Sequence, residues 1–257
     1  MILVGCGKIL TLQIKMVILL IHILCKGYYM KVSDAYSDLL HGEISGHGIA
    51  IEGSLQDKDK PRVLGYLNSG LLALYTRFPL LFKECRIRQL SYITTYKLNS
   101  KFAVTNTASS EVKYIIDSRI APFTDDVIRV EFVSDEVGDV LERNSTDYDK
   151  VYLTPSMDAI EVPNPCKGNV LFVTYRAHHP VLTSEVDEIL LPRHMLPALY
   201  AYVAAGIYSG SSSQEHVAKT VECTQRYEMI CQQLESAGMV NNDRQNIGTK
   251  QYWGGWV

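Results

Sequence analysis

Residues 191–208 read Leu-Pro-Arg-His-Met-Leu-Pro-Ala-Leu-Tyr-Ala-Tyr-Val-Ala-Ala-Gly-Ile-Tyr, and apolar residues recur there at the three- and four-residue spacing of a helix. A Gly/Ser turn follows, in which Ser212 with Glu215 fits a capping box for a second helix. Residues 189–208 and 212–237 are therefore predicted to form a helical hairpin. In its second helix the pattern predicts four buried side chains, Val217, Val221, Ile230 and Leu234. No residue of the hairpin suggests catalysis, so it is predicted to serve packing.

The chain before the hairpin is predicted to form two helices and then a series of short strands. Apolar periodicity predicts helices near 33–41 and 60–83, with Ser33 placed to cap the first. Short alternating β-rich runs separated by Pro, Gly, Asn and Asp follow at 87–96, 112–116, 127–133, 151–154, 159–162 and 170–175. Because neither helical part can bury a face alone, the two are predicted to pack together. The predicted fold class is α+β: an antiparallel helical bundle with an inserted antiparallel β domain.

The same patterns predict the domain organisation. The helical bundle domain comprises residues 30–84 and 184–240, and the inserted β domain comprises residues 85–183. Residues 241–257 are polar and Gly-rich but end in aromatic side chains, so they are predicted to form an extended C-terminal arm.

Residues 1–29 contain an apolar run over 16–24, well short of the ~20 residues that a membrane helix needs. No small-x-small cleavage site follows this run, which argues against a signal peptide. Codons that can encode residues 26–30 include a purine-rich ribosome-binding sequence before an ATG. The favoured interpretation is therefore a translated leader ahead of a start at Met30. The alternatives are a membrane-associated signal or anchor and a structured arm, and the intact mass of natively expressed protein distinguishes them.

Charge is unevenly distributed along the chain. The formal net charge is −3, but residues 1–30 hold three lysines and no acid, so residues 31–257 carry 22 basic against 28 acidic groups. A body with a net charge of −6 repels a phosphate backbone, so a general nucleic-acid binder is not predicted. The 257 residues, of which 47% are hydrophobic, suffice to bury a core.

Three pairs of polar residues are candidates for chemistry: His178–His179, Asp125–Asp126 and Glu215–His216. The two histidines lie at a strand end, where adjacent side chains point to opposite faces and do not easily share a metal. The two aspartates are typical of a turn at a strand start. The third pair lies in the first turn of a helix, where the carboxylate suits the dipole. No catalytic, cofactor-binding or metal site is predicted, and HExxH, GxSxG and GxxxxGK[ST] sequences are absent.

The six cysteines show no CxxC pair and no zinc-type spacing. Cys223 and Cys231 lie eight residues apart on one predicted helix, too far along its axis to bridge. Burial is predicted for both, and reduced thiols of a cytosolic protein are predicted for the chain. The sequence Asn144-Ser145-Thr146 spells a glycosylation sequon, but nothing in the chain secures secretion. The chain is not predicted to be an enzyme, and no cofactor is expected.

Five stretches in a fixed order carry a family resemblance: Leu-Asn-Ser-Gly-Leu-Leu-Ala-Leu-Tyr-Thr-Arg-Phe-Pro-Leu (67–80), Ala-Pro-Phe-Thr-Asp-Asp-Val-Ile-Arg-Val (121–130), Tyr-Leu-Thr-Pro-Ser-Met-Asp-Ala-Ile-Glu-Val-Pro (152–163), Val-Thr-Tyr-Arg-Ala-His-His-Pro (173–180) and Leu-Pro-Arg-His-Met-Leu-Pro-Ala-Leu-Tyr-Ala-Tyr-Val-Ala (191–204). Each is a packing pattern, and their order and spacing carry the likeness. With them, residues 31–240 resemble the head-to-tail adaptor (connector) proteins of tailed bacteriophages, including the portal-docking tail tubular adaptors of short-tailed phages.

This resemblance implies a structural virion protein at the head–tail junction, assembled in the host cytoplasm. Such a protein forms a ring, usually a dodecamer, between the portal protein at the capsid vertex and a tail or nozzle protein. DNA passes the lumen without specific binding, no membrane is involved, and the net charge of −6 predicts lumen walls that repel phosphate. The resemblance also implies that the C-terminal arm grips the portal, with Tyr252, Trp253 and Trp256 as predicted partner-binding residues. A disordered tail whose aromatic residues contact nothing is the alternative for this arm.

Other functions stay open at this point. Within the structural class, the chain is alternatively another virion component such as a tail-completion protein. From different classes come a membrane-tethered protein that uses residues 16–25 and an uncharacterised enzyme. Ring particles, formed alone or on meeting the portal, distinguish the adaptor from all of these.

Overall fold

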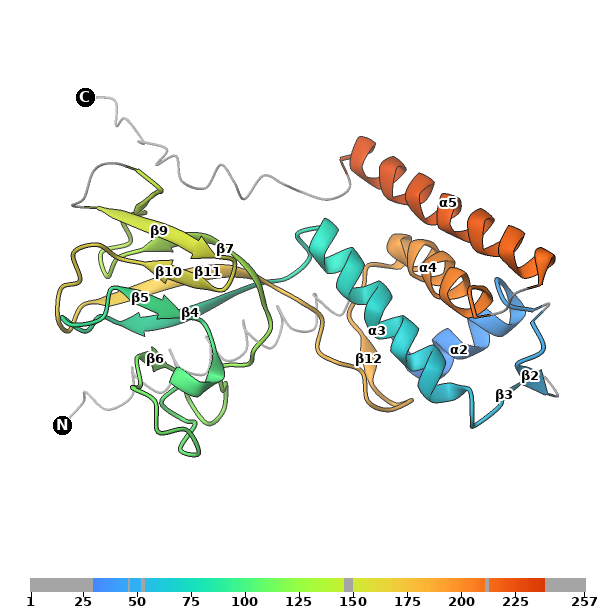
Figure 1. The fold of residues 1–257 in the computed structure, drawn as a ribbon, viewed down its shortest axis with the longest axis horizontal. Coiled ribbons are helices and arrows are strands. Elements are labelled where there is room, and N and C mark those ends of the chain that lie inside the picture. Colours follow the sequence, from blue (N-terminus) through green and yellow to red (C-terminus); the bar gives the residue numbers. More distant parts are fainter. Residues whose placement is uncertain (1–29, 46, 52–53, 146–149, 211–212, 239–257) are drawn as a thin grey trace, which may run out of the picture. The chain divides into compact units, whose positions relative to one another are not determined.

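The computed structural model describes residues 30–45, 47–51, 54–145, 150–210 and 213–238. The described helices are α2 (Val32–His41), α3 (Lys60–Arg77), α4 (Leu196–Tyr208) and α5 (Gln214–Ser236), with short 3-10 turns at Ser100–Phe102 and Arg193–Met195 (Figure 1). The strands are β1 (Met30–Lys31), β2 (Ala50–Ile51), β3 (Ser54–Leu55), β4 (Phe82–Arg88), β5 (Thr95–Lys97), β6 (Ile115–Ile116), β7 (Val127–Ser134), β8 (Glu142–Arg143), β9 (Val151–Ser156), β10 (Ala159–Glu161), β11 (Val170–Ala177) and β12 (Glu188–Ile189).

The chain divides into two compact units, each made of two separate stretches. Unit 1 holds the chain up to Leu67 together with Leu182–Ile230, and unit 2 holds Asn68–Val181 together with the chain from Cys231. The first part of α3 and most of α5 therefore belong to unit 1, while the ends of both helices belong to unit 2.

Unit 2 contains two four-stranded sheets. One has the order β6-β4-β11-β7 and is antiparallel throughout, and the other has the order β5-β10-β9-β8. The β8–β9 pair is parallel, so the prediction of a purely antiparallel β domain is wrong at this edge. The central strands β4 and β11 pair over seven residues, from Val170 opposite Arg88 to Arg176 opposite Phe82. This long register fixes which side chains face the core.

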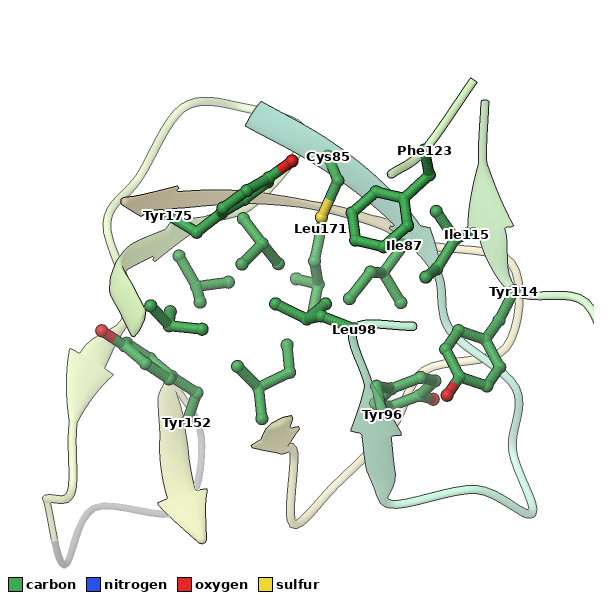
Figure 2. Close-up of a cluster of buried hydrophobic side chains, with 14 of the residues drawn as sticks. Cys85, Ile87, Tyr96, Leu98, Tyr114, Ile115, Phe123, Tyr152, Leu171 and Tyr175 are labelled. Carbon is green, nitrogen blue, oxygen red and sulfur yellow. The ribbon is translucent and has the colours of Figure 1, made fainter. Parts of the chain in front are cut away.

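The core of unit 2 lies between the inner faces of these strands and the segments that join them (Figure 2). Aliphatic side chains from β4, β6, β7 and β11 fill the centre, and tyrosines close it. Tyr96 and Tyr114 meet edge to face, with ring centroids 5.1 Å apart. Each hydroxyl also accepts a backbone N–H, from Leu90 at 3.0 Å for Tyr96 and from Lys97 at 2.9 Å for Tyr114. The buried tyrosines thus satisfy their polar atoms while contributing large apolar surfaces.

Unit 1 combines helices with short backbone ladders. Met30–Lys31 pairs with Glu188–Ile189 in one two-stranded sheet, and β2 pairs with β3 in another. Polar contacts connect its helices: the Tyr200 hydroxyl donates to an Asp38 carboxylate oxygen at 2.9 Å. Arg62 donates from Nη2 to the Ile207 carbonyl at 3.1 Å.

The predicted architecture is therefore wrong, although the α+β class is confirmed. The described residues form two four-stranded and two two-stranded sheets but only four α-helices, so the fold is not a helical bundle with an inserted β domain. Both two-stranded sheets lie in segments that periodicity had assigned to the bundle. The β1–β12 pairing joins segments far apart in the sequence, and the β2–β3 pairing lies in a loop between predicted helices, so helix periodicity encodes neither.

Several helices begin or end at residues other than the predicted ones. The helix predicted from residue 189 begins at Leu196, because β12 and the proline-flanked 3-10 turn precede it. Helix α3 ends at Arg77, two residues before Pro79. Ser33 lies inside α2, and its predicted capping role is wrong: the N-cap is Lys31, whose backbone N–H donates to the Asp34 carboxylate at 3.4 Å.

Two helical glycines of unit 1 predict opposite effects of the same substitution. A Cβ on Gly206 would lie 2.6 Å from Cδ1 of Tyr66, whereas a Cβ on Gly65 would meet nothing within 4 Å. We expect Gly206→Ala to lower the free energy of unfolding by about 1–3 kcal/mol through overpacking. Gly65→Ala is expected to raise it by about 0.5–1 kcal/mol, since alanine is the better helix former. Urea unfolding followed by circular dichroism checks both, and stabilisation by Gly206→Ala would show that α3 and α4 are not this close.

Candidate functional site

The solvent side of α5 in unit 1 exposes three large apolar side chains. Val217, Val221 and Met229 are 53%, 50% and 52% exposed. The first two are one turn apart, and all three lie outside the stripe that α5 buries. The Lys219–Glu222 ion pair, 2.8 Å between Nζ and Oε2, borders this face. We call the exposed surface formed by Val217, Val221 and Met229 the α5 outer face.

The buried stripe of α5 differs from the predicted one. Cys223 and Tyr227 are buried in unit 1, and Cys231 and Leu234 in unit 2. The prediction that Val217 and Val221 are buried is therefore wrong, Ile230 is only partly buried, and the prediction for Leu234 is confirmed. Tyr227 meets Tyr202 of α4 edge to face, with ring centroids 5.4 Å apart. An aromatic anchor to α4 thus sets the rotation of α5 and turns both valines outward.

The start of α5 is held by side chains around its first turn. The backbone N–H of His216 donates to the Ser213 hydroxyl at 3.2 Å, so Ser213 caps the helix. Ser212, the predicted cap, lies outside the described residues. Arg226, farther along α5, forms an ion pair with Glu43, 2.6 Å between Nη1 and Oε1.

His216 belongs to an aromatic cluster that sequence inspection missed. Its ring stacks on His47 with centroids 5.0 Å apart, and both rings meet Tyr208 edge to face at 5.3 Å. The Nδ1 atoms of both histidines are buried without a partner among the described residues. Burial, the neighbouring His216 and then Arg62 lower the pKa of His47, with Asp59 acting in the opposite sense. His47 therefore favours the neutral imidazole, and the stacked rings pack the loop at residue 47 against α4 and α5.

His178 and His179 each bond to backbone, as their adjacency predicts for residues that do not share a ligand. Nδ1 of His178 lies 2.7 Å from the carbonyl oxygen of His179. Nδ1 of His179 lies 2.5 Å from the carbonyl oxygen of Pro180. His179 is buried and meets Tyr75 edge to face at 5.5 Å. Burial lowers the pKa of His179.

Asp125 and Asp126 have separate roles. Asp125 accepts from the backbone N–H and the hydroxyl of Ser100, both at 2.6 Å. Asp126 is buried and binds Lys83 Nζ at 2.5 Å and the Tyr175 hydroxyl at 3.1 Å. The predicted turn residue Asp125 behaves as expected, whereas Asp126 belongs to a buried network of unit 2.

The cysteines of the described part are free thiols. Cys85, Cys223 and Cys231 are buried and Cys166 is exposed. Burial raises the pKa of Cys85 to about 12 and also raises that of Cys223. Thiols with raised pKa values are poor nucleophiles at neutral pH. The predicted burial of Cys223 and Cys231 is confirmed.

A hollow of about 560 Å³ lies in unit 1. Hydroxyl groups of Ser33, Tyr36 and Ser37 line it, together with Lys60. The ammonium of Lys60 lies 2.7 Å from Asp57 and 2.9 Å from Glu185, and these hydrogen bonds raise its pKa. Two carboxylates thus neutralise the cation, which leaves little attraction for an anion in this hollow.

Two further predicted sites, the glycosylation sequon and the C-terminal aromatic residues, lie partly or wholly outside the described residues. Asn144 adopts a left-handed backbone, with φ of 53°, while Thr146 of the sequon lies outside the described residues. Tyr252, Trp253 and Trp256 also lie outside them.

Within the described ranges, no three His, Cys, Asp or Glu side chains gather closely enough to hold a metal ion. Across the same ranges, every helix falls short of the length and apolar character that crossing a bilayer demands.

Both lowered histidine pKa values predict a stability that depends on pH. A histidine whose pKa is lower in the folded than in the unfolded protein binds fewer protons when folded. The free energy of unfolding should therefore be at its full value above about pH 6.5 and fall as the pH drops through and below the ordinary histidine pKa. His179→Gln is expected to flatten this dependence, measured as thermal midpoints from pH 8 to pH 5. The exposed His194→Gln variant is the control, and an unchanged pH profile in His179→Gln would contradict the assignment.

Comparison with known proteins adds no relative to this picture: no model of a known protein family matches the chain, and neither does any of the curated proteins.

Proposed function

We propose that the chain is a structural virion protein that forms a ring joining the portal at the capsid vertex to the phage tail. The proposal rests on the ordered motifs that resemble head-to-tail adaptors. The observation that carries it farthest is the α5 outer face. Half-exposed Val217, Val221 and Met229 give this helix an apolar surface that association with a second copy would bury.

Ring assembly suits a helix with two apolar faces. The inner stripe packs α5 within its own subunit, and the outer face remains available for a neighbouring copy. A ring arises when one patch meets a different patch of the next copy and the rotation closes. The net charge of −6 over residues 31–257 supports passage of DNA through the lumen, since acidic walls reduce phosphate contacts.

Light scattering with negative-stain imaging of the full chain, alone and with the portal protein, tests the proposal. The expected result is rings, or monomers that become rings on meeting the portal. A strictly monomeric protein that ignores the portal would overturn it. Binding to a completed tail instead of the portal would favour a tail-completion protein.

A matched pair of variants tests the α5 outer face. Val221→Glu places a charge at its centre and is expected to abolish ring formation, while circular dichroism and the thermal midpoint stay close to wild type. Val137→Glu makes the same change at an 87% exposed position between β7 and β8 and should leave rings intact. Rings that persist in Val221→Glu would show that copies meet through another surface.

A further inference from the structure

We propose that unit 2 contains a binding site for a phosphate group, in a pocket of about 220 Å³ between β7 and the β8–β9 ladder. Arg129 and Arg143 line this pocket together with Val130, Thr154, Pro155, Ser156 and Met157. Two of its lining residues are cationic, and none is a carboxylate. The site does not depend on ring assembly.

Positive charge is in excess around one carboxylate, that of Glu131. Arg129 and Arg176 are directly opposite each other on β7 and β11, an arrangement that like charges make unfavourable. Both guanidinium groups bind Glu131, at 2.9 Å from Nε of Arg129 and 3.0 Å from Nη2 of Arg176. One carboxylate therefore serves two arginines, and a net positive charge remains before Arg143 is counted.

The guanidinium of Arg176 has fewer hydrogen-bond acceptors than donors within the described residues. Its side chain is only 9% exposed, and Nη1 reaches the Thr76 carbonyl at 3.4 Å. Its Nε is buried with no acceptor in the described part of unit 2. Burial lowers the pKa of the Arg176 guanidinium, and the charge of nearby Arg129 lowers it further. Glu131 acts in the opposite sense and raises it. A bound anion would offset the repulsion within this cluster.

Arg143 adds a second cation to the pocket that no carboxylate of the described residues neutralises. Its Nη2 donates to the Thr154 hydroxyl at 3.4 Å. Asn144, which follows β8 and has a left-handed backbone, is joined to β9. Its side-chain oxygen accepts the Thr154 backbone N–H at 3.0 Å. The β8–β9 ladder places Arg143 opposite Tyr152. The bond to Thr154, a residue that also lines the pocket, places the Arg143 guanidinium beside it.

The remaining donors favour phosphate over carboxylate. Arg129 uses Nε and Nη2 on Glu131 and retains Nη1, and Arg143 retains Nε and Nη1. The Ser156 hydroxyl is already committed to Asp158 at 2.7 Å, so the arginines are the donors that a ligand would use. Two guanidinium forks offer more donors than the two oxygens of a carboxylate accept, whereas a phosphate presents three or four. The phosphate group could be free or part of a nucleic-acid backbone.

Titration calorimetry of the full chain with inorganic phosphate, at constant ionic strength against chloride, tests the site. The expected result is saturable binding that Arg143→Gln weakens about tenfold or more. Arg143→Lys, which keeps the charge but loses the fork, should fall between the two. Arg86→Gln is the matched control, because Arg86 is exposed on β4 outside the pocket. Thermal midpoints of each variant in chloride establish that it is folded.

Two further ligands separate the sources of the anion. A short single-stranded deoxyoligonucleotide that binds more tightly than inorganic phosphate, with the same loss in Arg143→Gln, assigns the site to a nucleic-acid backbone. Equal or weaker oligonucleotide binding assigns it to a free phosphate. Phosphate binding that is absent in wild type, unchanged in Arg143→Gln, or no stronger than that of acetate would overturn the proposal.

Discussion

Ile87→Ala is expected to lower the free energy of unfolding of unit 2 by about 2–5 kcal/mol. Ile87 is fully buried on β4, where it lies opposite Leu171 of β11 and Ile115 of β6. Truncation removes apolar contacts on both sides of a central strand and leaves a cavity that the paired backbones cannot close. Hydrogen exchange of the β11 amides measures the loss directly in unit 2.

The same substitution at Ile120 is the control. This residue is 98% exposed in the loop between β6 and β7, so Ile120→Ala should change the free energy of unfolding by less than about 0.5 kcal/mol. Similar losses at Ile87 and Ile120 would contradict the assignment of Ile87 to the centre of the core.

The strands of unit 2 were largely predictable, because their inner residues alternate with polar ones. The runs predicted at 127–133 and 170–175 correspond to β7 and β11, which each extend slightly further. The strand predicted at 87–96 is instead the end of β4, a turn and the start of β5. Alternation continues through that turn, and so a local pattern cannot show where the chain reverses.

Pairing between distant segments was not predictable from local patterns. Nothing near Met30 indicates that it pairs with Ile189, and the error in the overall architecture follows from such ladders. The arginine pocket was missed for the same reason. Arg129 and Arg176 face each other only because β7 pairs with β11, and Arg143, which lines the pocket with Arg129, lies on β8 of the other sheet. In the sequence they are three isolated charges.

The rotation of α5 illustrates a different limit. Valines at 217 and 221 and the cysteine and tyrosine at 223 and 227 give the helix two apolar stripes at helical spacing. Periodicity identifies both stripes but not which one packs inward. The structure selects the stripe with Tyr227, whose ring meets Tyr202 on α4. The α5 outer face could therefore be recognised only once the neighbouring helix was placed.

Asp126→Ala is expected to lower the free energy of unfolding of unit 2 by about 2–4 kcal/mol. Its carboxylate accepts from Lys83 and from the Tyr175 hydroxyl in a buried setting. Burial and then the charge of Asp126 raise the pKa of Tyr175, which therefore stays protonated and donates. Removing the carboxylate leaves this hydroxyl buried without its acceptor. Asp125→Ala is the neighbouring control, with an expected loss of about 1 kcal/mol, because Asp125 is exposed and its carboxylate bonds only Ser100 among the described residues.

A double-mutant cycle isolates the buried contact from other effects of these substitutions. Tyr175→Phe alone should cost about 1 kcal/mol, because it removes one hydrogen bond and keeps the ring in the core. In the Asp126→Ala background the same change should cost less, with a coupling energy of about 0.5–3 kcal/mol between the two positions. Additive losses, measured by hydrogen exchange of the β11 amides, would mean that the hydroxyl and the carboxylate do not interact. In that case Lys83 alone, 38% exposed and able to reach water, would account for the effect of Asp126→Ala.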